Sequence, residues 1–313
     1  MYYIGIDVGG TNIKAGLVDE EGAIVYRAQT PTLATRPGEE IGADIGRLAK
    51  KVAEESGTAL SEIHSIGIGM PGACSDETGM VLYTANINIS GFPLREAVQK
   101  EIPLPVHLGN DANCAALGEY YMLDEKVSDM VFITLGTGVG GGLVLNGKLY
   151  TGFNGIAGEV GHIMLRHDGE KCGCGRRGCW EAYASVTALI RQTRAFAEAN
   201  PDSAVAKSCG ADFSELSGKT AFALAKEGDA DAQQIVDAWI RYVADGVTDM
   251  INIFQPEILL VGGAISREGD TLLVPLRERV EAEMYKSCVP QTEIRIASLG
   301  NDAGLIGAAF LGK

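Results

Sequence analysis

The stretch YYIGIDVGGTNIKAGLV, residues 2–18, places two apolar runs on either side of a glycine-rich turn. Residues 2–7 and 13–18 are rich in residues that favour strands, and the glycines between them allow a tight turn. This predicts a β-hairpin whose turn presents backbone N–H groups and the Thr11 hydroxyl, a geometry that suits an anion such as phosphate. Asp7 ends the first strand, where its carboxylate could hold Mg²⁺ or, alternatively, stabilise the turn through an Asx contact.

A similar pattern recurs over residues 130–145, where a strand-like run, the turn GTGVGGG and a second apolar run follow one another. We interpret it as an internal duplication, although two glycine-rich hairpins can also look alike without being repeats. Gly136, Thr137 and Gly138 would then form a second phosphate turn. Gly136, Gly138 and Gly141 also match the G-x-G-x-x-G pattern of dinucleotide binding, but that motif requires a helix next and the chain continues as a strand. A nicotinamide-dependent dehydrogenase is therefore disfavoured.

The rest of the chain alternates between strand-like and helix-like segments, which predicts an α/β fold. Strands are expected at residues 63–68, 106–108 and 258–261, and helices within residues 38–57, 112–122, 185–200, 229–254 and 302–311.

Charge and composition exclude several classes of protein. The chain has 26 basic and 41 acidic residues, a net charge of −15, which repels nucleic acid and anionic membranes. No apolar run is long enough to cross a bilayer, and the N-terminus has no features of a signal peptide, so a cytosolic protein is expected. No P-loop and no H-R-D loop is present, which excludes P-loop enzymes and protein kinases.

Asp111 follows Gly109 and Asn110 at the end of a predicted strand and precedes a predicted helix. It could be the N-cap of that helix. It could also be a general base, because a helix N-terminus keeps a carboxylate ionised and able to accept the proton of an attacking hydroxyl. The two roles are compatible.

Three of the seven cysteines crowd into eight residues and lie close to a histidine. One histidine and three cysteines form a tetrahedral, structural Zn²⁺ site, and this is favoured over free cytosolic thiols. The metal would also hold the neighbouring Glu159 and Glu181 in place. The four expected ligands are His162, Cys172, Cys174 and Cys179, and the other cysteines, Cys74, Cys114, Cys209 and Cys288, are expected to be buried as small apolar side chains.

Taken together, these motifs resemble the ROK family of sugar kinases and sugar-responsive repressors, over essentially the whole chain. Within that family the chain is most similar to the bacterial ATP-dependent glucokinases. The matching elements are DVGGTNIK at residues 7–14, GMPG at 69–72, NDAN at 110–113, TLGTG at 134–138, EVGH at 159–162 and CGCGRRGCWE at 172–181.

The resemblance implies an actin/hexokinase-like (ribonuclease H-like) α/β fold with two α/β domains around a cleft. The smaller domain would contain residues 1–117 and 298–313, and the larger one residues 118–297. The implied reaction is ATP-dependent phosphorylation of the 6-hydroxyl of a hexose, first of all D-glucose to glucose 6-phosphate, by a homodimer or homotetramer without nucleic-acid or membrane partners.

The resemblance also assigns residues to roles. Asp111 would be the catalytic base. The sugar would be bound by Gly72, Asn86, Asn110, Asp111, Glu159, His162 and Glu181. ATP with Mg²⁺ would be bound by Asp7, Gly9, Gly10, Thr11 and Asn12, by Gly136, Thr137 and Gly138, and by Gly262 and Gly263 near the adenosine. His162 would have one ring nitrogen on zinc and the other toward the sugar.

Two positions depart from the family pattern. Asn12 stands where the first turn often has lysine, and the nearest basic residue is Lys14, which puts a lysine–phosphate contact in doubt. Ile89 replaces an aromatic residue of the glucokinase-like segment, which leaves N-acetylmannosamine, mannose and allose open as substrates. A family repressor that senses a sugar is a further alternative, but such proteins carry an added N-terminal helix-turn-helix, whereas the first strand here is expected at residue 2.

Overall fold

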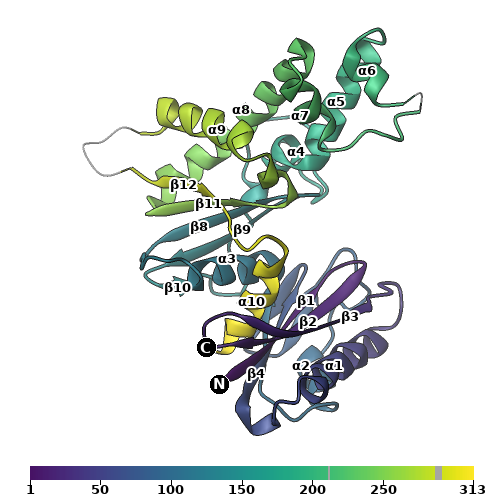
Figure 1. Cartoon of the computed structure of the whole chain (residues 1–313), viewed down its shortest axis with the longest axis vertical. Coiled ribbons are helices and arrows are strands. Elements are labelled where there is room, and N and C mark those ends of the chain that lie inside the picture. Colours follow the sequence, from purple (N-terminus) through teal and green to yellow (C-terminus); the bar gives the residue numbers. More distant parts are fainter. Residues whose placement is uncertain (211, 286–290) are drawn as a thin grey trace. The chain divides into compact units, whose positions relative to one another are not determined.

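The computed structural model describes residues 1–210, 212–285 and 291–313, and in it the chain forms two compact units (Figure 1). The first unit contains residues 1–130, 142–158 and 298–313, and the second contains residues 131–141 and 159–297. A boundary after residue 117 would cut helix α3 (Asp111–Tyr121), and the change of unit lies after residue 130 instead.

A five-stranded sheet with the order β3-β2-β1-β4-β7 lies at the centre of the first unit. β1 pairs with β2 in antiparallel fashion across the glycine turn, which confirms the predicted hairpin, and β2 pairs likewise with β3. β1, β4 and β7 are parallel, so their carboxyl ends share one edge of the sheet. The strands are β1 (Tyr2–Val8), β2 (Asn12–Asp19), β3 (Ile24–Pro31), β4 (Ile63–Met70) and β7 (Val106–Asn110), of which β3 was not predicted.

Helices cover both faces of this sheet because its strands are apolar on both sides. Ile4 and Ile6 of β1 join a core cluster with the apolar face of α1 (Gly38–Glu55), the predicted amphipathic helix. Tyr3 points to the other face and packs with α3 and α10 (Ala303–Ala309). A short hairpin, β5 (Ala73–Ser75) with β6 (Met80–Tyr83), and α2 (Leu94–Gln99) complete the unit.

The second sheet has the order β10-β9-β8-β11-β12. Position by position this is the order of the first sheet, a glycine-turn hairpin at the centre with one strand outside the hairpin and two strands on the other side, and it confirms the predicted duplication. The second turn is shorter than expected, because β9 already begins at Val139. The strands are β8 (Met130–Leu135), β9 (Val139–Leu145), β10 (Lys148–Leu149), β11 (Ile258–Gly262) and β12 (Glu293–Ile296).

The second unit is also rich in helices, and the two long ones predicted between residues 185 and 254 are present. Its helices are α4 (Glu181–Ala184), α5 (Val186–Ala199), α6 (Ala204–Ser208), α7 (Thr220–Lys226), α8 (Ala230–Phe254) and α9 (Asp270–Glu283). Among the described residues no helix has the length and apolar character that spanning a membrane requires.

The cysteines expected in the core are found there where the structure describes them. Cys74, Cys114 and Cys209 are buried. Cys288 lies outside the described residues.

Candidate active site

The first glycine turn is closed by its own backbone and by Thr32, the residue after β3. Gly9 N donates to Asn12 O over 3.0 Å. Thr32, which is buried, donates its hydroxyl to Gly9 O over 2.6 Å and its N–H to Thr11 O over 2.9 Å. With these carbonyls engaged inside, Gly10 and Thr11 are exposed at the tip of the turn, as the phosphate-turn prediction requires.

Asp7 lies at the carboxyl edge of the sheet, in register with Gly69 of β4. Burial raises the pKa of its carboxyl, and the positive charge of Lys14 partly opposes that rise. Lys14 is the residue directly opposite Asp7 on β2. A half-buried carboxylate with one ammonium neighbour retains affinity for a further cation, which fits the predicted Mg²⁺ site.

Helix α3 begins where β7 ends, and its N-cap is Asn110, not Asp111. The Asn110 side chain accepts from Ala112 N over 2.9 Å and from Asn113 N over 3.1 Å. Its amide donates to Gly72 O over 3.0 Å. The expected N-cap role of Asp111 is therefore wrong, since Asn110 occupies that position, although Asp111 Oδ1 also accepts from Ala112 N over 2.8 Å.

Asp111 is the first residue of α3, where the backbone N–H groups of the helix favour an ionised carboxylate. Its charge reaches two buried thiols. Burial and then Asp111 raise the pKa of Cys74 to about 12. The pKa of Cys114 is also raised, by burial first, then by Asp111 and then by Asp7. Asp7 and Asp111 thus act on the same thiol, which brings the predicted metal side and the predicted base to one edge of the first sheet.

The other residues of the first unit that were predicted to bind or border the sugar differ in their surroundings. Gly72 has a φ of +94°, and a Cβ there would meet Tyr83 O at 2.2 Å. Asn86 is exposed on the loop after β6. Ile89 is 1% exposed and packs in the core of the unit, so its effect on a pocket wall would be indirect.

The second glycine turn is held by residues that the sequence motifs did not indicate. Gly136 N donates to Gly138 O over 3.0 Å, and Val186 N donates to Gly136 O over 2.9 Å. The Thr187 hydroxyl donates to Thr137 O over 2.8 Å. Val186 and Thr187 begin α5, about 50 positions from the turn, and no local pattern links them to it. β9 follows the turn directly, which removes the helix that a dinucleotide fingerprint needs.

Of the two glycines predicted near the adenosine, Gly262 ends β11 and Gly263 directly follows that strand. Gly263 has a φ of +90°, and a Cβ there would meet Leu135 O of β8 at 2.2 Å.

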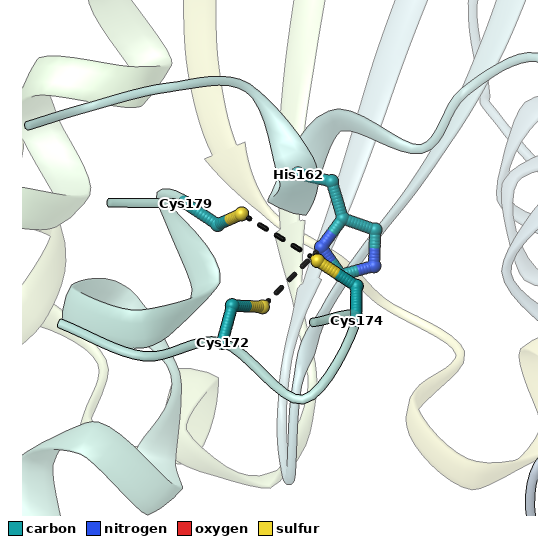
Figure 2. A group of neighbouring side chains, drawn as sticks. All are labelled: His162, Cys172, Cys174 and Cys179. Carbon is teal, nitrogen blue, oxygen red and sulfur yellow. Dashed lines mark hydrogen bonds between the residues drawn. The ribbon is translucent and has the colours of Figure 1, made fainter. Parts of the chain in front are cut away.

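The predicted metal ligands converge in the second unit (Figure 2). The ligand atoms of His162, Cys172, Cys174 and Cys179 all lie within 4.8 Å of one another. The sulfurs of Cys174 and Cys179 are 3.7 Å apart, and Cys172 Sγ is 3.6 Å from His162 Nδ1. Zinc bond lengths and tetrahedral angles require about 3.8 Å between two sulfurs and about 3.6 Å between sulfur and nitrogen. The donor set and its spacing therefore fit Zn²⁺.

The two glutamates predicted beside the metal lie on different sides of this cluster. His162 turns Nδ1 toward Cys172, while its Nε2 is 3.9 Å from Glu159 Oε2. The Glu181 carboxylate instead accepts from Cys172 Sγ over 3.3 Å and from Val139 N over 3.1 Å. Nε2 of His162 thus remains on the side of Glu159, away from the cluster, as its predicted double role requires.

Comparison with known proteins places this geometry in a family. The ROK family matches residues 3–313. A glucokinase of Halalkalibacterium halodurans is 38% identical over 317 residues, covering 100% of this chain and 95% of the relative. An N-acetylmannosamine kinase of Yersinia pseudotuberculosis serotype O:1b is 32% identical over 98% of this chain and 97% of the relative.

Among solved structures, a ROK family glucokinase from Streptomyces griseus in complex with glucose and AMPPNP has a TM-score of 0.83 at 37% identity, over 99% of both chains. This likeness confirms the predicted actin/hexokinase-like α/β fold. With one family matching nearly every residue and relatives similar from end to end, the chain belongs to the ROK family.

Proposed function

We propose that this protein transfers the γ-phosphoryl group of MgATP to the 6-hydroxyl of a hexose, with D-glucose as the first candidate. The full-length similarity to glucokinases, and to a structure that contains glucose and an ATP analogue, supports this proposal. The observation that carries it is the position of Asp111, a carboxylate at the start of α3 on the sheet edge that also presents Asp7 and the first glycine turn.

Asp111 is the proposed general base. The sugar hydroxyl donates its proton to the carboxylate as its oxygen attacks the phosphorus, and the N-terminus of α3 keeps the carboxylate ionised beforehand. Because phosphoryl transfer is mainly a matter of alignment and charge neutralisation, the remaining residues hold the reactants. The proposed sugar ligands are Gly72, Asn86 and Asn110 of the first unit and Glu159, His162 and Glu181 of the second.

The proposed nucleotide ligands are the two glycine turns, with Gly262 and Gly263 on the adenosine side. Gly10 and Thr11 are exposed residues, and backbone N–H groups in a turn of this kind suit phosphate oxygens. Asp7 would hold Mg²⁺, which neutralises charge on the transferred group. Asn12 follows Thr11 and supplies an amide where a lysine is often found, so this turn relies on backbone dipoles for anion binding.

The reaction is tested by ADP release from MgATP with glucose, mannose, allose, fructose, N-acetylglucosamine and N-acetylmannosamine. Replacing the proposed base, Asp111→Asn, is expected to lower kcat by roughly 10²- to 10⁴-fold. Asp270→Asn is the matched control, since Asp270 is likewise the first residue of a helix, α9. An Asp111→Asn protein as active as the wild type would refute the proposal, and sugar binding without turnover would favour a sugar sensor.

We also propose that His162, Cys172, Cys174 and Cys179 hold one structural Zn²⁺ per chain, because all four positions of a tetrahedral site are filled by protein. Bound there, the metal would fix the loop that carries Glu159 and Glu181. Elemental analysis of reduced, purified protein is expected to find one zinc per chain, and Cys174→Ala to reduce it to roughly a tenth or less. Cys209→Ala, a change at a buried cysteine outside the cluster, should keep the zinc. Wild-type protein without zinc would contradict this assignment.

Finally, we propose that the protein assembles as a homodimer or homotetramer, as the family resemblance implies. Light scattering at several protein concentrations measures this directly, and a monomer at every concentration would refute it.

A further inference from the structure

One carboxylate in the second unit contacts two functional groups at once. Glu181 Oε2 accepts from Val139 N over 3.1 Å, directly after Gly138 of the second glycine turn. Its Oε1 lies 3.3 Å from Cys172 Sγ, which donates to it only while the thiol is protonated and not when Cys172 binds Zn²⁺ as a thiolate. Glu181 begins α4 and follows Trp180, which is fully buried, so its backbone is firmly held. Glu181 therefore links the second glycine turn, through Val139 N, to the chain segment that directly follows the predicted ligand Cys179.

We infer that Glu181 is a positioning residue that couples sugar binding to the conformation of the nucleotide turn. The inference rests on the proposed function, in which Glu181 binds a sugar hydroxyl and the turn binds ATP. Because the same carboxylate would bind the sugar hydroxyl and the N–H group of Val139, sugar binding would alter the geometry of the turn. Thermodynamic linkage requires the effect to be reciprocal, so a change in the turn that displaces the Glu181 carboxylate must alter sugar affinity.

Gly138 provides the means to test this from the turn side. A Cβ on Gly138 would lie 2.3 Å from Glu181 Oε2, which means that the carboxylate occupies the space a side chain would need. The φ of Gly138 is not in the left-handed region, so alanine is compatible with its backbone. Because the obstructed atom is the end of a flexible side chain, alanine should displace the carboxylate and not the fold.

The experiment measures the glucose Kd by calorimetry, without nucleotide, for the wild-type protein, Gly138→Ala and Asp270→Asn. Gly138→Ala is expected to weaken glucose binding by roughly tenfold, the effect of losing a hydrogen bond to a charged group. Asp270→Asn, an exposed change at the start of α9 and outside the proposed sites, should stay within about twofold of the wild type. Equal glucose affinity in the two variants would overturn the inference while leaving the proposed function intact. A wild-type protein that binds none of the sugars would overturn both.

A second measurement replaces Glu181 itself and separates a positioning role from a general structural role. Glu181→Gln retains a carbonyl oxygen that can accept from Val139 N, whereas Glu181→Ala does not. The Kd for MgAMPPNP without sugar should therefore rise roughly tenfold in Glu181→Ala and be largely rescued in Glu181→Gln. Wild-type nucleotide affinity in Glu181→Ala, or an equal loss in both variants, would contradict the coupling.

Discussion

The carboxyl groups of Asp7 and Asp302 lie in opposite electrostatic environments. Asp7 is placed at the edge of a buried strand, and burial raises the pKa of its carboxyl despite the opposing charge of Lys14. Asp302 has the reverse environment, because Arg27 binds it with two hydrogen bonds of 2.6 and 2.8 Å and lowers its pKa. Of these two carboxylates, Asp7 alone is proposed to meet a metal ion, and without one its ionised form is the energetically unfavourable one.

We predict that Asp7→Asn stabilises the fold at neutral pH. A carboxyl with a raised folded-state pKa contributes stability below the unfolded-state pKa, near 3.8, and loses that contribution as the pH rises through the folded value. At pH 7 the ionised carboxylate is therefore destabilising, and the asparagine variant should melt roughly 2 °C higher in Mg²⁺-free buffer. The difference should shrink toward pH 3.5.

Asp302→Asn is the control with the opposite sign. Its folded pKa is lowered, so the native residue stabilises above pH 3.8 and that contribution is lost as the pH falls. Thermal melts at several pH values compare the two variants. A lower melting temperature for Asp7→Asn at pH 7 would show that burial does not dominate at this position.

Among the elements, the long helix α8 packs against Trp180, which follows the predicted metal ligand Cys179. Trp180 lies between Cys179 and Glu181, and its indole N–H donates to Tyr242 O of α8 over 2.7 Å. The ring lies directly over Gly246, one helical turn further along, where a Cβ would come within 2.0 Å of Trp180 Cε2. Both tryptophans of the chain, Trp180 and Trp239, are fully buried against this helix or within it.

We predict that Gly246→Ala reverses the usual effect of replacing a helical glycine. Alanine normally gains about 0.5–1 kcal/mol in a helix interior. Here it overpacks against Trp180 and should lower the free energy of unfolding by about 1–3 kcal/mol. Urea unfolding followed by tryptophan fluorescence measures the change, and zinc content should fall as the loop shifts. Ala238→Gly, at an exposed position of α8, measures the intrinsic helix preference of alanine over glycine. A stabilising Gly246→Ala would refute the packing argument.

At the scale of the whole molecule, the net charge affects the stability of the fold. The chain carries a formal charge of −15, and self-repulsion of this size opposes the folded state. Ion pairs such as Arg27–Asp302 and Arg36–Asp44 are partly exposed and contribute little each.

We therefore predict that salt stabilises this protein. Raising NaCl from 20 to 300 mM shortens the Debye length from about 20 Å to about 6 Å and screens the net repulsion more than it weakens the exposed pairs. The melting temperature should rise by roughly 2 °C or more. Chloride is used because sulfate strengthens apolar burial by itself. A melting temperature that falls with NaCl would mean that the ion pairs outweigh the net charge.

The local elements with strong patterns could be predicted from the sequence. Short-range patterns mark the glycine turn between β1 and β2, the apolar spacing of α1 and the His/Cys cluster. In each, neighbouring residues already determine backbone geometry or donor chemistry. The duplicated hairpin could be predicted for the same reason. β3 was missed because its side chains alternate between half-buried and exposed positions, so it lacks an apolar run.

The sequence by itself determined the α/β class, the two glycine-rich turns and the candidate residues Asp7 and Asp111. Only the tertiary structure decided that Asn110 caps α3, that Thr32 and Thr187 close the two turns, and that Glu181 reaches Val139. Most of these contacts join residues that lie far apart in the chain. In the case of Asn110, two neighbouring residues compete for the same N–H groups. Hydrogen bonds of this kind depend on distances that local patterns do not encode, and packing alone brings the partners together.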